Sequence, residues 1–384
     1  MKKMYWTASH FRPAMMTLMA VVSLGCLTLV ESNKVLVPQG HYDLKLKAAE
    51  LSEKAMKAVK KERLRRGISI DKKFDPGMSG LIGKKQTSIT SDRGVLNSKQ
   101  ISVDPNLAAL IVQWLYDLNL KKGDVVAVGM TGSFPGLDIS TLAALQVMEL
   151  KPILITSGTA SNWGANIPQY NILDMLSVLN KADILKTAPI ASSIGASKDL
   201  GKNLDQSGLN SILNTIKKYN IPLIKEPMVS DSINKRLQLY SEAAGEDEIK
   251  AYINIGGGVA SIGKHYTKPN LSKEQKDKII SSHLKTGPNF DMPVSLANTN
   301  SVAIRYLKLG IPVINVKNVT KIAMDYNLKP WKASMSIGVG TLFFHEKYNI
   351  WLALLGLLVI VATCYAEMRM QWQQKKAEAD EQLI

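Results

Sequence analysis

The chain has 384 residues, 46% of them hydrophobic, and a formal net charge of +16. That length allows one large domain or two ordinary ones with a substantial core, and the basic balance favours a polyanionic partner such as nucleic acid, anionic lipid or an acidic polymer. The two cysteines, Cys26 and Cys364, lie in apolar runs near the termini, which excludes a disulfide framework and a cysteine metal site from the middle of the chain.

Two uncharged runs near the ends of the chain are long enough to cross a bilayer. The first predicts a transmembrane helix over residues 13–31, and the second predicts one over residues 348–366. For the first run a signal sequence remains an alternative to a transmembrane helix, because Ser23-Leu-Gly-Cys26 partly resembles a lipoprotein cleavage site with a lipidated cysteine. For either run the other alternative is a buried core helix.

Basic residues flank the outer end of each run. They are Lys2, Lys3 and Arg12 at one end and Arg369, Lys375 and Lys376 at the other. The positive-inside rule then places residues 1–12 and the tail 367–384 in the cytoplasm, and everything from about residue 32 to residue 347 outside. The chain is therefore expected to cross a membrane twice.

Residues 32–103 predict a helix followed by an irregular connection. From His41 to Arg66 apolar residues recur at helical spacing. This helix ends in a basic cluster of Lys57, Lys60, Lys61, Arg63, Arg65 and Arg66. The cluster suits either a polyanion or lipid headgroup, or simply the C-terminal end of a helix dipole. Residues 75–102 are rich in Gly, Ser, Thr and Lys, which favours a functional or structured connection over a plain linker.

Short apolar runs alternate with amphipathic runs from residue 104 to residue 347. The expected strands are 125–128, 152–156, 188–194, 221–224, 251–255 and 311–316, and the expected helices are 107–118, 139–150, 172–179, 209–219, 232–244, 300–309 and 319–326. This alternation predicts an extracytoplasmic α/β domain, with a mainly parallel, Rossmann-like sheet and helices on both faces. Ligands of such sheets bind at the carboxyl ends of strands, near a topological switch point.

The stretch GDVVAVGMTGSFPGLD, from Gly123 to Asp138, has the pattern of a strand, a turn and the start of a helix. Its glycines match neither the dinucleotide fingerprint nor a P-loop, and its serine is not placed as in a G-x-S-x-G nucleophile elbow. The turn offers the backbone of Gly132, the hydroxyls of Thr131 and Ser133 and the carboxylate of Asp138. Ser133 is a candidate nucleophile, and the alternative is that these hydroxyls bind an anion or cap the helix.

Two further loops follow predicted strands. One reads SGTASNWGAN and contributes Ser157 and Asn162, and the other is the run Gly256, Gly257 and Gly258, which lets a backbone approach a ligand closely. Because both loops follow strands, they are expected to converge with the serine turn as a ligand-binding site. The alternative for the glycines is a tight crossover from strand to helix.

No metal ion and no cofactor are expected. His265 and His283 have no metal-ligand spacing, and each is expected to be a surface or packing residue rather than a general base. Asp291 is a loop carboxylate without an evident partner. Nucleic acid is not an expected partner, because no stretch combines basic and aromatic residues as single-strand binders do.

Four segments of the chain resemble the bacterial poly-gamma-glutamate system protein family. They are GLIGKKQTSITSDRGVLNSKQ (80–100), VAVGMTGSFPGLD (126–138), ITSGTASNWGAN (155–166) and YINIGGGVASIGK (252–264). The resemblance covers most of the chain, including both terminal runs, and it brings no catalytic assignment. It implies a membrane-bound accessory part in making, exporting or anchoring poly-gamma-glutamate, located in the bacterial cytoplasmic (inner) membrane.

Three functions follow as expectations. The first is an accessory subunit that binds the anionic polymer outside and contacts the other membrane subunits of the synthase or export complex. The second is a membrane-tethered hydrolase or transferase that acts on the polymer or on a cell-wall acceptor through Ser133 and the Gly256 loop. The third is a small-anion-binding domain. The sequence contains no recognised pair of nucleophile and base, which favours the first and leaves open whether the protein is an enzyme.

Overall fold

The computed structural model describes residues 13–186, 188–263, 300–316, 318–332 and 335–381. The chain divides into two compact units. One unit is the domain Gly40–Phe343, and the other combines the two terminal arms, Met1–Gln39 and Phe344–Ile384.

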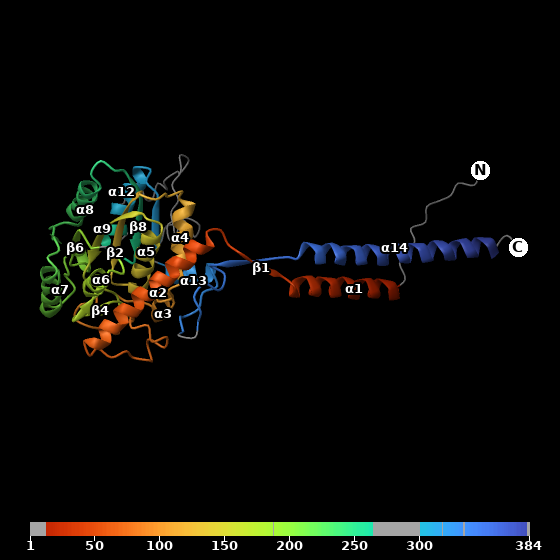
Figure 1. The fold of residues 1–384 in the computed structure, drawn as a ribbon, viewed down its shortest axis with the longest axis horizontal. Helices are drawn as coiled ribbons and strands as arrows, with labels where there is room; N and C mark the ends of the chain where they lie inside the picture. Colours follow the sequence, from red (N-terminus) through yellow and green to blue (C-terminus); the bar gives the residue numbers. More distant parts are fainter. Residues whose placement is uncertain (1–12, 187, 264–299, 317, 333–334, 382–384) are drawn as a thin grey trace. The chain divides into compact units, whose positions relative to one another are not determined.

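A six-stranded sheet forms the centre of the domain (Figure 1). Its strands, in chain order, are β2 (Val125–Thr131), β3 (Lys151–Ser157), β6 (Ala191–Ser193), β7 (Leu223–Ile224), β8 (Ile249–Ile255) and β9 (Val313–Val316). The spatial order is β7-β6-β3-β2-β8-β9, and every neighbouring pair is parallel. The predicted α/β fold with a parallel sheet is therefore confirmed. All seven residues of β2 are buried, as expected of a central strand with an apolar run.

The direction of strand addition reverses at β2. From β2 the chain adds β3, β6 and β7 on one side, and it then returns to add β8 and β9 on the other. The first series is connected by α5 (Pro135–Val147), α6 (Ile172–Lys181) and α7 (Gln206–Lys218), and the second by α8 (Val229–Ala244), α9 (Val259–Ile262) and α12 (Val302–Lys308). Because parallel crossovers are right-handed, the two series cover opposite faces of the sheet. The switch point lies between β2 and β8.

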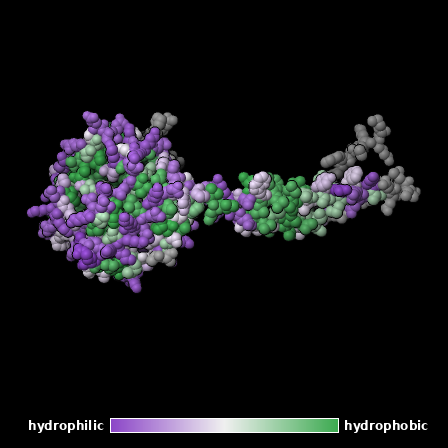
Figure 2. All heavy atoms as spheres, viewed as in Figure 1, coloured by the Kyte–Doolittle hydropathy of each residue, from purple (hydrophilic) through white to green (hydrophobic). Residues whose placement is uncertain are grey.

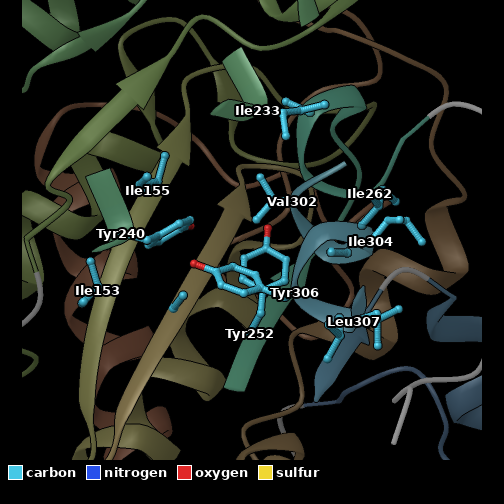
Figure 3. Close-up of a cluster of buried hydrophobic side chains, with 14 of the residues drawn as sticks. Ile153, Ile155, Ile233, Tyr240, Tyr252, Ile262, Val302, Ile304, Tyr306 and Leu307 are labelled. Atoms are coloured by element: carbon cyan, nitrogen blue, oxygen red, sulfur yellow. The ribbon is translucent and has the colours of Figure 1, made fainter. Parts of the chain in front are cut away.

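The face covered by α8, α9 and α12 is packed with aliphatic side chains and three tyrosines (Figure 3). Tyr240, Tyr252 and Tyr306 lie with their ring centroids 5.3–6.3 Å apart. The Tyr240 hydroxyl donates to the backbone oxygen of Val128 at 2.8 Å. This bond ties α8 to the middle of β2.

On the α5 side, α2 (Tyr42–Arg65) and α4 (Leu107–Asp117) pack against α5 and against each other. The helix predicted over residues 41–66 is therefore present. Part of its basic cluster is structural: the buried Arg63 guanidinium donates to the backbone oxygens of Gly80 at 2.9 Å and Ile82 at 2.7 Å. Arg65 and Arg66 both bond Glu62, so these charges are partly neutralised on their own helix.

The segment 75–102 has little helix or strand except at its end, where its last residues form a helix that the sequence did not indicate. This helix is α3 (Leu96–Ser102), and it contacts α5 and α13 (Val319–Asp325). Its buried side chains include polar ones, such as Ser98 and Lys99, which hide the usual apolar periodicity.

The terminal unit contains α1 (Pro13–Ser32), β1 (Val35–Pro38), β10 (Phe344–Lys347) and α14 (Ile350–Glu381). β1 and β10 pair antiparallel, and α1 contacts α14 along a line where Gly356 lies against Cys26. Both helices expose apolar side chains (Figure 2) and are long and apolar enough to cross a membrane. α14 runs past the predicted end at residue 366, because residues with high helix propensity follow the apolar run.

Candidate functional site

The loops after β2, β3 and β8 meet at the carboxyl edge of the sheet, as expected from their positions after parallel strands. The backbone N–H of Ala165 donates to the backbone oxygen of Gly132 at 2.7 Å, which joins the first two loops. On the other side, Gly256 has a φ of +89°, and a Cβ there would clash with the Thr131 hydroxyl. A glycine is therefore required at this position for the third loop to approach the first.

A buried lysine from α3 lies beneath the first two loops. The Lys99 side chain is 2% exposed. Its Nζ donates to the Ser161 hydroxyl at 2.7 Å and to the backbone oxygen of Ser133, and it lies 3.8 Å from the centre of the Phe134 ring. One amine therefore contacts both serine-bearing loops.

The two serines have different partners. The Ser133 hydroxyl accepts a bond from the Ser161 backbone N–H at 3.2 Å, and the Ser133 N–H donates to Thr131 Oγ1 at 3.3 Å. Ser161 instead places its hydroxyl against the Lys99 amine. Within the described chain, the serine paired with a potential base is thus Ser161, while the predicted nucleophile Ser133 and the hydroxyl of Thr131 hold the turn and its neighbouring loop together.

Asp138, on the first turn of α5, is completely buried. Neither of its carboxyl oxygens has a hydrogen-bond partner within the described residues. Burial raises the pKa of Asp138 well above its usual range, and the Lys99 charge opposes this shift. Burial also lowers the pKa of Lys99 to about 7, against the attraction of Asp138. A large share of the Lys99 side chains is therefore uncharged near neutral pH.

The other predicted loop residues have structural partners. The Ser157 hydroxyl bonds that of Ser193 at 3.1 Å, within a buried network that also includes Asp199 and Arg236. Asn162 accepts a bond from the Gly94 N–H at 2.9 Å and donates to the backbone oxygen of Lys85. Asn162 thus fastens the segment before α3 onto the loop after β3.

The glycine loop after β8 borders open space. A Cβ on Gly257 would meet no atom within 4 Å, and Gly258 is exposed with a φ of +115°. A pocket of about 290 Å³ lies at the same edge, lined by residues that follow β6, β7 and β8: Lys198, Pro227, Met228, Val229 and Val259. The loop and the pocket leave room for a ligand where the residues that follow β6, β7 and β8 come together.

The structure does not describe three further residues that the sequence analysis considered. His265, His283 and Asp291 lie outside the described residues. No group of three or more His, Cys, Asp or Glu side chains is arranged to hold a metal ion in the part of the chain that the structure describes.

Sequence reasoning missed Lys99 and the pairing role of Ser161. The sequence could have indicated Ser161, because its loop follows β3, the strand that pairs with β2. For Lys99 there was no such signal, because a lysine in a polar segment reads as a surface residue. The packing of α3 against α5 and α13 brings this amine to the carboxyl edge.

Comparisons of the chain with family models, with curated proteins and with solved structures each found no match.

Proposed function

We propose that this protein is a membrane-anchored accessory component of poly-gamma-glutamate synthesis or export, whose domain Gly40–Phe343 binds the anionic polymer outside the cell membrane. The observation that carries the proposal is a division of charge and apolarity along the chain. Most of the excess of Lys and Arg over Asp and Glu falls in the domain, and the apolar helices α1 and α14 precede and follow it in the sequence.

Exposed cations at the carboxyl edge support polymer binding there. They are Lys84, Lys85 and Arg93, in the segment fastened to the loop after β3, and Lys198 and Lys202, which follow β6. Poly-gamma-glutamate carries one free carboxylate per residue. Such a chain is attracted over a Debye length of roughly 8 Å at physiological salt.

The pairing of the two arms supports a single topology. The Tyr348 hydroxyl, just before α14, donates to Glu31 at the end of α1 at 3.2 Å, and Lys34 lies 5.0 Å from the centre of the Tyr348 ring. If both helices span the bilayer, these adjoining ends lie on one side and both termini on the other. The basic outer flanks then place the termini in the cytoplasm.

Polymer binding is tested with the full-length protein in detergent micelles over a series of salt concentrations. We expect binding to poly-gamma-glutamate that weakens steeply as salt rises. A triple variant with Lys84→Gln, Lys85→Gln and Arg93→Gln should bind about tenfold more weakly, because the change removes charge where we place the polymer.

The matched control removes the same charge from the opposite edge of the sheet. It carries Lys121→Gln, Lys122→Gln and Lys151→Gln, which are exposed residues at the amino ends of β2 and β3. We expect this variant to bind nearly as well as the unchanged protein. An equal loss in both triple variants, or binding that does not respond to salt, would contradict the proposed site.

A further inference from the structure

We infer that Ser161 and Lys99 form a serine–lysine pair for acyl transfer, with Ser161 Oγ as the nucleophile and Lys99 Nζ as its base, acting on the carbonyl carbon of an amide or ester. This goes beyond polymer binding and does not depend on it. The pair also differs from the Ser133 nucleophile that the sequence suggests.

The geometry meets the first requirement of such a pair. Ser161 Oγ and Lys99 Nζ are 2.7 Å apart, within the range for transfer of a proton between a nucleophile and its base. Ser161 is 9% exposed and Lys99 only 2%, so more of the serine than of the lysine is accessible to solvent. We therefore expect an arriving carbonyl group to approach from the side of Ser161.

The surroundings of the amine meet the second requirement, a base that is uncharged near neutral pH. Phe134 covers one side of Lys99 Nζ, and the acidic group that influences its pKa is Asp138, from α5. Burial outweighs the attraction of Asp138 and lowers the pKa of Lys99 to about 7. The unprotonated amine can then accept the Ser161 hydroxyl proton.

A purely structural tether would not need these features. A lysine that only joined two loops would bond their oxygens best as an ammonium ion. Burial disfavours this charged form of the side chain. The neighbouring acid is consistent with an uncharged amine. Burial raises the pKa of Asp138 well above its usual range, so this carboxyl adds little negative charge that would hold Lys99 as an ammonium ion.

The reaction balances without an oxidant or reductant. Ser161 Oγ attacks the carbonyl carbon while its proton passes to Lys99 Nζ, and the carbon–nitrogen or carbon–oxygen bond then breaks as Lys99 returns that proton to the leaving group. The acyl group remains on Ser161 as an ester. Water or an acceptor amine attacks this ester and gives a proton to Lys99, and that proton returns to Ser161 Oγ as the serine is released.

The test uses a fluorophosphonate probe, which reacts with activated serine hydroxyls, on the full-length protein in detergent micelles. We expect an adduct on Ser161, located by peptide mass spectrometry. Its rate of formation should rise with pH around a midpoint near 7 and level off above the pKa of Lys99. Ser161→Ala should abolish the adduct.

Three variants separate the roles of the neighbouring groups. Ser261→Ala, at the same edge of the sheet, should label at the same rate as the unchanged protein, and Ser133→Ala should keep its adduct on Ser161. Lys99→Met should label at least about a hundredfold more slowly, because it removes the base but keeps a side chain of similar length. If Lys99→Met fails to fold, the pH profile of the unchanged protein decides.

Several results would overturn the inference. They are a Ser161 adduct that never forms at any pH, an adduct on Ser133 instead, and a labelling rate that stays constant from pH 5 to pH 9. A folded Lys99→Met variant that labels as fast as the unchanged protein would also overturn it. The probe contains no polymer, so a failure here is distinct from a failure of poly-gamma-glutamate binding.

Discussion

Asp104 is a buried carboxyl group in the connection between α3 and α4. Its Oδ1 accepts the backbone N–H of Asn106 at 2.9 Å, which lowers its pKa, but burial has the larger effect. The net result raises the pKa of Asp104 from 3.8 to about 6. The folded protein therefore keeps a proton on Asp104 at pH values where the unfolded chain has already lost it.

This difference predicts how stability depends on pH. The stabilisation from the Asp104 proton is fully present below pH 3.8 and is lost as the pH rises through about 6. Asp104→Asn does not titrate and keeps an oxygen for the Asn106 N–H. We therefore expect the free energy of unfolding of the variant, relative to that of the unchanged protein, to rise by up to about 3 kcal/mol as the pH increases from 4 to 7.

Thermal unfolding of both proteins in micelles, measured at several pH values, checks this. The other buried acids, including Asp138, are the same in both proteins, so their effects cancel in the difference. A difference in the free energy of unfolding that stays flat from pH 4 to pH 7 would show that Asp104 ionises normally in the folded protein.

At the scale of an element, the glycine loop after β8 sets how closely that strand's exit approaches the turn after β2. Gly256 has positive φ and faces the Thr131 hydroxyl, whereas Gly257 faces open space and does not have a positive φ. The two neighbours therefore offer a matched pair of substitutions. Both exchange a glycine for an alanine in one loop.

We expect Gly256→Ala to lower the free energy of unfolding by about 1–3 kcal/mol, because it combines a strained backbone with a clash against Thr131. Gly257→Ala should change it by less than about 0.5 kcal/mol. Chemical denaturation of the two variants provides the measurement. Equal effects would mean that the loop adjusts freely and that its approach to Thr131 is not fixed.

The strands and helices of this domain were largely predictable because most of them keep a clear period. The run Val125–Val128 predicted β2, and the spacing of apolar residues after His41 predicted α2. The convergence of the loops was also predictable, because parallel strands end at one edge. The paired strands β1 and β10 were missed, since each has only four residues and its partner lies at the other end of the chain.

The chemistry of the site was less accessible to sequence reasoning. Ser133 was the predicted nucleophile because it follows the most evident strand. The structure instead places the Lys99 amine beside the hydroxyl of Ser161. The deciding residue, Lys99, comes from a helix whose burial depends on tertiary packing against α5. Local patterns report periodicity, and they do not report which polar side chain is buried by a distant element.

At the scale of the whole molecule, the terminal arms bear on which side of a membrane the domain lies. Because Tyr348 is bonded to Glu31, two spanning helices would place both termini on the same side. We propose that the basic flanks Lys375 and Lys376 place that side in the cytoplasm. Under this proposal the domain and its exposed cations face the exported polymer.

Single cysteines test this topology. The natural cysteines, Cys26 and Cys364, are first replaced by alanine, and Lys61→Cys or Lys376→Cys is then introduced at an exposed position of α2 or α14. We expect a membrane-impermeant maleimide to label the cysteine at position 61 in intact spheroplasts and the cysteine at position 376 only after permeabilisation. The reverse pattern would place the domain in the cytoplasm, away from the exported polymer. Labelling of both positions in intact spheroplasts would mean that the two helices do not both cross the membrane as an antiparallel pair.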